Sequence, residues 1–242
     1  MATRTAQLDA WFETPLGQRI LRVETQNLST LLPQLFGFHL VQIGSIGQGQ
    51  LLESSRIRHK WILSRSLDTP SPCVYAHATA LPFANDSVDV VVLPHILDFE
   101  DHPHEVLREV QRVLIPEGHV IILGFNPLSL WGLWHWFLLK REVAPWCGRF
   151  LPILRIKDWL ALLGLDVVTQ RTFFFSLPLQ RQHFIRTAQQ LDQWGERWLP
   201  TMGAIYVLVA CKRVLPLTLI RPRWQQQPVL VTSGMVGMNR ES

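Results

Sequence analysis

Residues 76–124 read AHATALPFANDSVDVVVLPHILDFEDHPHEVLREVQRVLIPEGHVIILG, and this stretch decides the fold. Residues 88–93 form a nearly unbroken β-branched run, as expected of a strand buried on both faces of a parallel sheet. The apolar positions within 105–114 recur at the spacing of one helix face. A second buried strand follows over 119–125. Strand, helix and strand with short connections predict a βαβ unit with a right-handed crossover.

The predicted helix has signals at both ends. Asp101 and Pro103 suit the N-cap and first turn, and residues 116–118 (PEG) end the helix in a turn. Acidic and histidine side chains also crowd this helix start in a way that resembles a metal site: Asp98, Glu100, Asp101, His102 and His104. The helix start explains their presence, and we predict no metal site.

The rest of the chain predicts further elements and three regions. Residues 1–35 read as a helical lead-in, residues 36–214 as the main domain, and residues 215–242 as an extended basic tail. Within the domain, residues 126–200 form an aromatic-rich, partly helical elaboration. The individual strands are expected over 38–43, 61–63, 74–76, 166–175 and 203–214, and the helices over 14–31, 51–60, 155–163 and 180–199.

The order of these elements, with the segment 76–124, resembles class I S-adenosylmethionine-dependent methyltransferases, in the branch of the ubiquinone- and menaquinone-pathway C-methyltransferases. It is also similar to a group of bacterial methyltransferase-like proteins with an abbreviated, degenerate cofactor loop. The resemblance implies a Rossmann-like α/β fold. That fold has a mostly parallel seven-stranded sheet, helices on both faces and an antiparallel last strand. It also implies S-adenosylmethionine as the cofactor.

The cofactor half departs from the pattern that the resemblance implies. In the family, the first strand ends in an acid followed by a G-x-G-x-G loop, whose glycines let the backbone approach the cofactor. Here Gln42 replaces the acid and Gly44 is in place, but Gly47 and Gly49 are displaced by one residue. The other interpretation of this run is a tight strand-to-helix turn that binds nothing.

Two further contacts of the family are altered. The acid that accepts both ribose hydroxyls at the end of the second strand is absent, leaving Ser64 or Asp68 as weak substitutes. His77 stands where an Asp would accept from the adenine amine, and it is otherwise an exposed loop residue. The resemblance therefore implies a cofactor site at the following residues: Gly44, Ser45, Gly47, Gly49, His77, Ala78 and Pro94.

His95 follows the fourth strand at the carboxyl edge of the sheet, where ligands bind in such folds, and is the candidate general base. A packing histidine is the alternative. The aromatic run 131–137 either lines a pocket for a small apolar acceptor or packs on the sheet. The predicted function is methyl transfer to a small-molecule acceptor. The alternative is a noncatalytic methyltransferase-like protein that binds a protein partner.

Composition bounds these expectations. The 242 residues are 48% hydrophobic and 17% charged, as in a well-filled globular core. Three unpaired cysteines and the absence of a signal-like N-terminus fit the cytoplasm. The net charge of +4 lies partly near the C-terminus, on Lys212, Arg213, Arg221 and Arg223, which suits a solvated tail; we expect no nucleic-acid partner. The apolar window 120–139 is interrupted by Asn126-Pro127 and His135, so no membrane span is predicted.

Overall fold

The computed structural model describes residues 4–64, 73–138, 144–175 and 202–213. Seven strands form one sheet in the order β3-β2-β1-β4-β5-β7-β6. Their bounds are β1 His39–Ile43, β2 His59–Ser64, β3 Cys73–Tyr75, β4 Val88–Pro94, β5 Leu114–Phe125, β6 Leu165–Phe173 and β7 Ile205–Lys212. Strands β1 to β5 pair in parallel, and β7 runs antiparallel to both β5 and β6. This topology confirms the predicted fold class.

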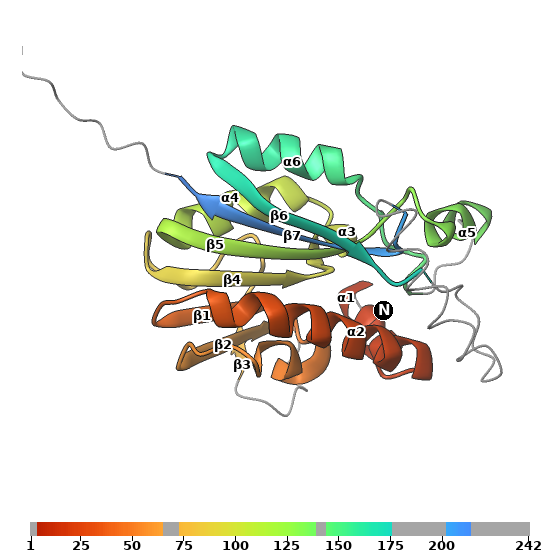
Figure 1. Ribbon diagram of the computed structural model, residues 1–242, viewed down its shortest axis with the longest axis horizontal. Helices are drawn as coiled ribbons and strands as arrows, with labels where there is room; N and C mark the ends of the chain where they lie inside the picture. The colour runs from red at the N-terminus through yellow and green to blue at the C-terminus, as the bar shows by residue number, and fades with distance from the viewer. Residues whose placement is uncertain (1–3, 65–72, 139–143, 176–201, 214–242) are drawn as a thin grey trace, which may run out of the picture.

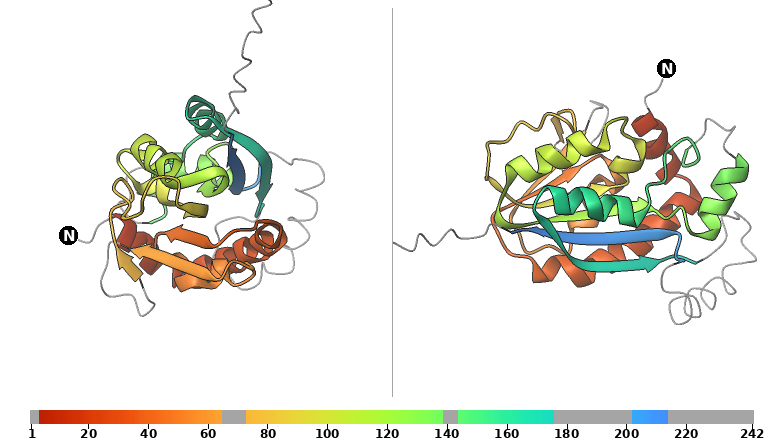
Figure 2. Two further views of the ribbon diagram at one scale, coloured as in Figure 1. Left: turned by 90° about the vertical axis from the view of Figure 1, so that its left-hand side faces the viewer. Right: turned by 90° about the horizontal axis from the view of Figure 1, so that it is seen from above.

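Helices cover both faces of the sheet (Figures 1 and 2). The helices are α1 Arg4–Phe12, α2 Pro15–Leu31, α3 Ile96–Phe99, α4 Pro103–Val113, α5 Leu130–Leu138 and α6 Ile153–Leu162, with 3-10 turns η1 Leu32–Gln34 and η2 Ile46–Leu52. Helices α1 and α2 pack with one face, and α4 and α6 pack with the other. Among the described residues, no helix combines the length and the apolar character that a membrane crossing requires.

Strand β4 shows why its sequence is a continuous apolar run. Val90 and Val92 belong to the core on the α2 side, whereas Val91 and Leu93 belong to the core on the α4 side. All four side chains are fully buried, so neither face of the strand can be polar. On the facing helix, Val110 is also fully buried. The predicted βαβ unit is therefore the centre of the molecule.

Helix α2 is part of the folded core. The Thr14 hydroxyl accepts a hydrogen bond from the Gly17 amide at 3.2 Å, and Pro15 occupies the first helical turn. Its apolar face includes Ile20 and Leu28, which are fully buried. This face packs against the sheet face that carries Val90 and Val92 of β4. Residues 4–31 thus form a layer of the fold.

The predicted helix over 51–60 is wrong. The chain after β1 instead forms η2, in which Gly47, Gln48 and Gly49 all have positive φ, at 67°, 46° and 96°. A right-handed helix cannot continue through three left-handed residues, so the segment turns and enters β2 at His59. Helix α2 packs closely over this turn, and a Cβ added at Gly47 would lie 2.7 Å from the Leu21 side chain.

The start of α4 and the end of β7 also differ from expectation. The N-cap of α4 is His102, with Pro103 following, and Asp101 lies one residue earlier. Lys212, expected in a solvated tail, is 9% exposed, and its ammonium donates to Asp86, at 2.6 Å, and to two backbone carbonyls. The expected helix 180–199 and tail 215–242 lie outside the described residues.

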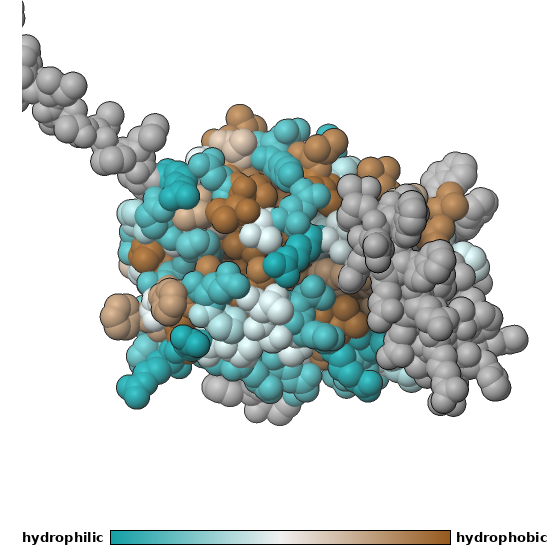
Figure 3. Space-filling model, viewed as in Figure 1, coloured by the Kyte–Doolittle hydropathy of each residue, from teal (hydrophilic) through white to brown (hydrophobic). Residues whose placement is uncertain are grey.

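Part of the sheet face beside α2 remains apolar at the surface. In the space-filling view, hydrophobic residues gather above α2, over the strands β5, β7 and β6 (Figure 3). Val168 of β6 is 57% exposed. The antiparallel side of the sheet is therefore less covered than the parallel side in this view.

Candidate functional site

A pocket of about 530 Å³, counting the part open to solvent, lies at the carboxyl ends of β1 and β2. Its walls come from α1, the loop that begins at Gly44, the end of β2 at Ser64, the small residues Ala76 and Ala78, and Ile96 of α3. Helix α1 lies at this edge, where the arrows of β1 and β4 end (Figure 1). The carboxyl edge of parallel strands is where open α/β sheets bind ligands.

Gly44 begins the loop with a φ of 102°, in the left-handed region that favours glycine. A Cβ at this position would lie 2.8 Å from the Ile96 side chain. Gln42, which is fully buried, donates from its side-chain amide to the carbonyls of Gly44 and Ile46, both at 2.8 Å. Gln42 therefore fixes the loop from inside, in place of an acid, and its own Oε1 has no hydrogen-bond partner among the residues that the structure describes.

Three polar side chains from distant parts of the sequence meet at the pocket. The Ser45 hydroxyl donates to the Asp9 carboxylate at 2.6 Å, and the Ser64 hydroxyl lies 3.4 Å from that of Ser45. Burial raises the pKa of Asp9, while the hydrogen bond from Ser45 acts in the opposite direction. The charge of Glu13 adds to the increase. Asp9 thus brings a partly desolvated carboxylate to the pocket.

The predicted cofactor residues divide into those that line this pocket and those that do not. Gly44, Ser45 and Ala78 line it. Gly47 and Gly49 form the turn behind the loop, where their positive φ values shape η2. His77 is exposed and pairs through its backbone with Ala80, while Pro94 is buried at the end of β4. None of these four is part of the pocket wall.

His95 lies in the protein interior, as a residue with a φ of 55° between β4 and α3. Its Nε2 is 2.6 Å from Oε1 of Glu24, which comes from α2, and both side chains have zero exposure. Its Nδ1 lies 3.8 Å from Asp98 Oδ2. The Asp98 carboxylate also accepts hydrogen bonds from the backbone amides of Phe125 and Leu151. The three charged side chains form one buried cluster.

The electrostatics of this cluster favour a charged imidazolium. Burial opposes the charge on His95, but the carboxylates of Glu24 and Asp98 outweigh it and raise the pKa of His95 to about 9. Burial also raises the pKa of Asp98, against the effect of its contact with His95. In this conformation His95 is protonated near neutral pH and faces the core, so it holds a proton that it cannot exchange with a ligand in the pocket.

Comparison with known proteins agrees with this architecture. Residues 56–122 match the methyltransferase domain family. The uncharacterized protein YafS of Escherichia coli is 32% identical over 211 residues, which cover 87% of this chain and 83% of YafS. The chain belongs to the class I methyltransferase family.

More distant relatives extend the comparison. The ubiquinone/menaquinone biosynthesis C-methyltransferase UbiE of Roseobacter denitrificans is 28% identical over 127 residues, which cover 52% of this chain and 49% of UbiE. A Haloferax volcanii chain solved in complex with the Trm112 methyltransferase activator superposes with a TM-score of 0.64 at 17% identity. That superposition covers 88% of this chain and 99% of the other. At such low identity, the second likeness concerns the fold alone.

The aromatic segment of the protein packs into its core. Trp131 is 1% exposed and stacks on Phe125, with ring centroids 6.1 Å apart and an interplanar angle of 5°. Phe150 also stacks on Phe125, with ring centroids 5.0 Å apart. Trp134, by contrast, is 43% exposed on the outer side of α5. Of the two interpretations of this run, core packing therefore describes Trp131.

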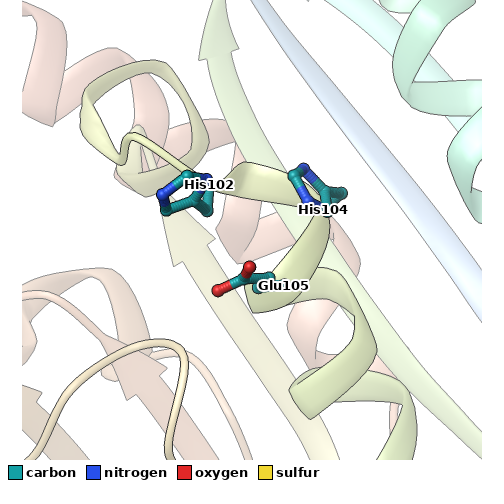
Figure 4. Close-up of side chains that lie close together, drawn as sticks. All are labelled: His102, His104 and Glu105. Atoms are coloured by element: carbon teal, nitrogen blue, oxygen red, sulfur yellow. The ribbon is translucent and has the colours of Figure 1, made fainter.

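The histidines that resemble metal ligands lie on the surface. His102, His104 and Glu105 lie at the exposed N-terminal end of α4, with their ligand atoms within 4.8 Å of one another (Figure 4). Asp98, in contrast, points inward to His95 and does not join them. The acidic and histidine residues that crowd this helix start in the sequence are thus divided between the surface and the core.

Two residues were not identified as candidates from the sequence: Glu24 of the buried cluster and Asp9 of the pocket. Glu24 falls between Ile20 and Leu28 at intervals of four, so it is a charge on the apolar face of an amphipathic helix. That position is a usable signal for a buried ion pair. Asp9 has no such signal, because its approach to Ser45 depends on how α1 folds across the sheet edge.

Proposed function

We propose that this chain is an S-adenosylmethionine-dependent methyltransferase that acts on a small apolar acceptor. The proposal is supported by the family of the chain and by the pocket at the carboxyl ends of β1 and β2. The single observation that carries it is Gly44, whose positive φ and missing Cβ let a ligand approach the loop backbone.

The residues present suit such a cofactor. Ala76 and Ala78 offer small side chains opposite the Gly44 loop, which leaves room for a flat nucleobase. Ser45, Ser64 and Asp9 bring polar groups to the same pocket. When bound, the cofactor supplies the electrophilic methyl group, so the protein has to position the acceptor and exclude water.

The surroundings of the pocket favour an apolar acceptor. Ile43, Leu63 and Leu8 line it, and each is at most 3% exposed. We retain His95 as the proposed general base only for a conformation in which Glu24 has moved away from it. While the pair is closed, the imidazolium cannot accept a proton.

The test is calorimetric titration of the full chain with S-adenosylhomocysteine, up to millimolar concentration. Saturable heat with the fold intact supports the proposal. The absence of heat from folded protein overturns it and favours the second candidate, a noncatalytic protein that binds a protein partner. That candidate is favoured by Gln42 and Ser64, which stand where the family has acids. A methyltransferase activator is one partner to try, since the Haloferax volcanii neighbour was solved with one.

A further inference from the structure

The carboxyl end of β2 places a serine where a carboxylate is expected. Leu63 pairs with Ile43 in the parallel register, and the Gly44 amide donates to the Leu63 carbonyl at 2.7 Å. Ser64 is therefore held beside the glycine loop, at the pocket. A serine hydroxyl can accept a hydrogen bond from one ribose hydroxyl. It lacks the charge and the two oxygens with which a carboxylate accepts hydrogen bonds from two adjacent hydroxyls.

A carboxylate nevertheless reaches this end of the pocket. Asp9 of α1 accepts the Ser45 hydrogen bond at 2.6 Å, and Ser45 in turn lies 3.4 Å from Ser64. Ser45 donates to one of the two carboxylate oxygens of Asp9, Oδ2, and an ionised carboxylate can accept about four hydrogen bonds. The carboxylate thus keeps capacity for further hydrogen bonds on the side of the pocket.

We propose that Asp9 accepts the hydrogen bonds of the cofactor ribose hydroxyls, and so supplies from α1 the carboxylate that β2 lacks. The inference rests on the proposed function. It assigns a binding role to a residue outside the sheet, on a helix that lines the pocket.

The packing of α1 does not depend on the side chain of Asp9. Leu8 and Phe12, at 1% and 2% exposure, anchor α1 in the core. Burial raises the pKa of Asp9, so its charge opposes folding at neutral pH. A charged group that weakens the fold and faces a pocket is typical of a binding residue.

The test compares S-adenosylhomocysteine with its 2′-deoxy analogue, by calorimetric titration of wild type and three variants. In wild type, we expect the analogue to bind about 10-fold more weakly, since a hydrogen bond to a charged acceptor is lost. Asp9→Asn should bind S-adenosylhomocysteine about 10-fold more weakly than wild type and should lose most of the discrimination. Asp9→Glu keeps the carboxylate and should retain the discrimination. Glu100→Gln, which changes the other acid in the pocket wall, is the matched control and should behave as wild type.

The outcomes separate the inference from the function on which it rests. If wild type does not bind S-adenosylhomocysteine, both are overturned. If wild type binds but Asp9→Asn binds equally well and still discriminates, the role of Asp9 is overturned and the proposed function stands. Loss of discrimination in Glu100→Gln alone also overturns it. Asn can still accept the Ser45 hydrogen bond, so Asp9→Asn should fold, and a thermal melt by circular dichroism verifies this. If Asp9→Asn does not fold, Asp9→Glu provides a second test of the carboxylate.

Discussion

Replacing Glu24 by Gln should destabilise the protein in a pH-dependent way. Glu24 and His95 are joined at 2.6 Å with zero exposure, so the pair lies in a low-dielectric interior. The variant keeps the size and a hydrogen-bond acceptor but removes the charge that, with Asp98, holds the imidazolium. The cost is therefore mainly electrostatic.

The magnitude follows from the pKa of His95. An increase from 6.5 to about 9 corresponds to about 3 kcal/mol of stability, at 1.36 kcal/mol for each pKa unit. Because the folded pKa is raised, this contribution is fully present below about pH 6.5 and is lost as the pH rises through about 9. Asp98 shares in the increase, so the free energy of unfolding of Glu24→Gln should be below that of wild type at pH 6 by up to about 3 kcal/mol. The difference should shrink as the pH rises from about 6.5 to about 9.

Urea denaturation at pH 6, 7.5 and 9 measures this difference, with unchanged slopes confirming that the same transition is compared. Glu13→Gln, at an exposed position near the start of α2, is the matched control and should change stability by less than about 1 kcal/mol at each pH. A Glu24→Gln difference that stays constant from pH 6 to 9 would refute the electrostatic reasoning. So would an NMR titration in which His95 loses its proton near 6.5.

Three further substitutions test the fold and the loop. Val110→Asp places an unpaired charge at a fully buried position and should lower the free energy of unfolding by at least about 3 kcal/mol, measured by urea denaturation; an unchanged midpoint would contradict the packing of α4. Gly44→Ala adds a Cβ at a φ of 102°, 2.8 Å from Ile96, and should reduce S-adenosylhomocysteine affinity while the circular dichroism spectrum is retained; equal affinity would place the site elsewhere. Lys212→Met removes the donor to two carbonyls and to Asp86 and should cost about 1–3 kcal/mol, seen as a lower melting temperature; no change would mean that these contacts are dispensable.

The sequence predicted the sheet well because its strands are buried on both faces. Within the run 88–93, residues 90–93 are apolar on both faces of the strand, so the strand is buried only between two apolar layers. The helix predicted over 105–114 supplies one of these layers. The strand 203–214 was identified in the same way, and β7 occupies Ile205–Lys212 within it. Local periodicity is sufficient where burial is continuous along an element.

The sequence failed where tertiary contacts replace local ones. The polar stretch 51–60 reads as a short helix, yet η2 ends at Leu52 and β2 begins at His59. The positive φ of Gly47 and Gly49 keeps η2 from continuing as an α-helix. Nothing local in residues 51–60 indicates that α2 covers this side of the sheet. Likewise, the buried partner of His95 lies 71 residues away, at Glu24. Pairings at that distance depend on the packing of whole elements.

The departures of the cofactor half share one physical origin. The first half of the domain lacks a long helix after β1, and residues 4–31 provide the layer that such a helix would form. Only Glu13 and Thr14 separate α1 from α2, and α1 lies at the carboxyl edge, where its residues line the pocket. The same segment thereby brings Asp9 to the pocket and Glu24 to His95. Changes in the loop and at the end of β2 therefore need not mean loss of the site, since the N-terminal segment supplies polar groups that the strands do not.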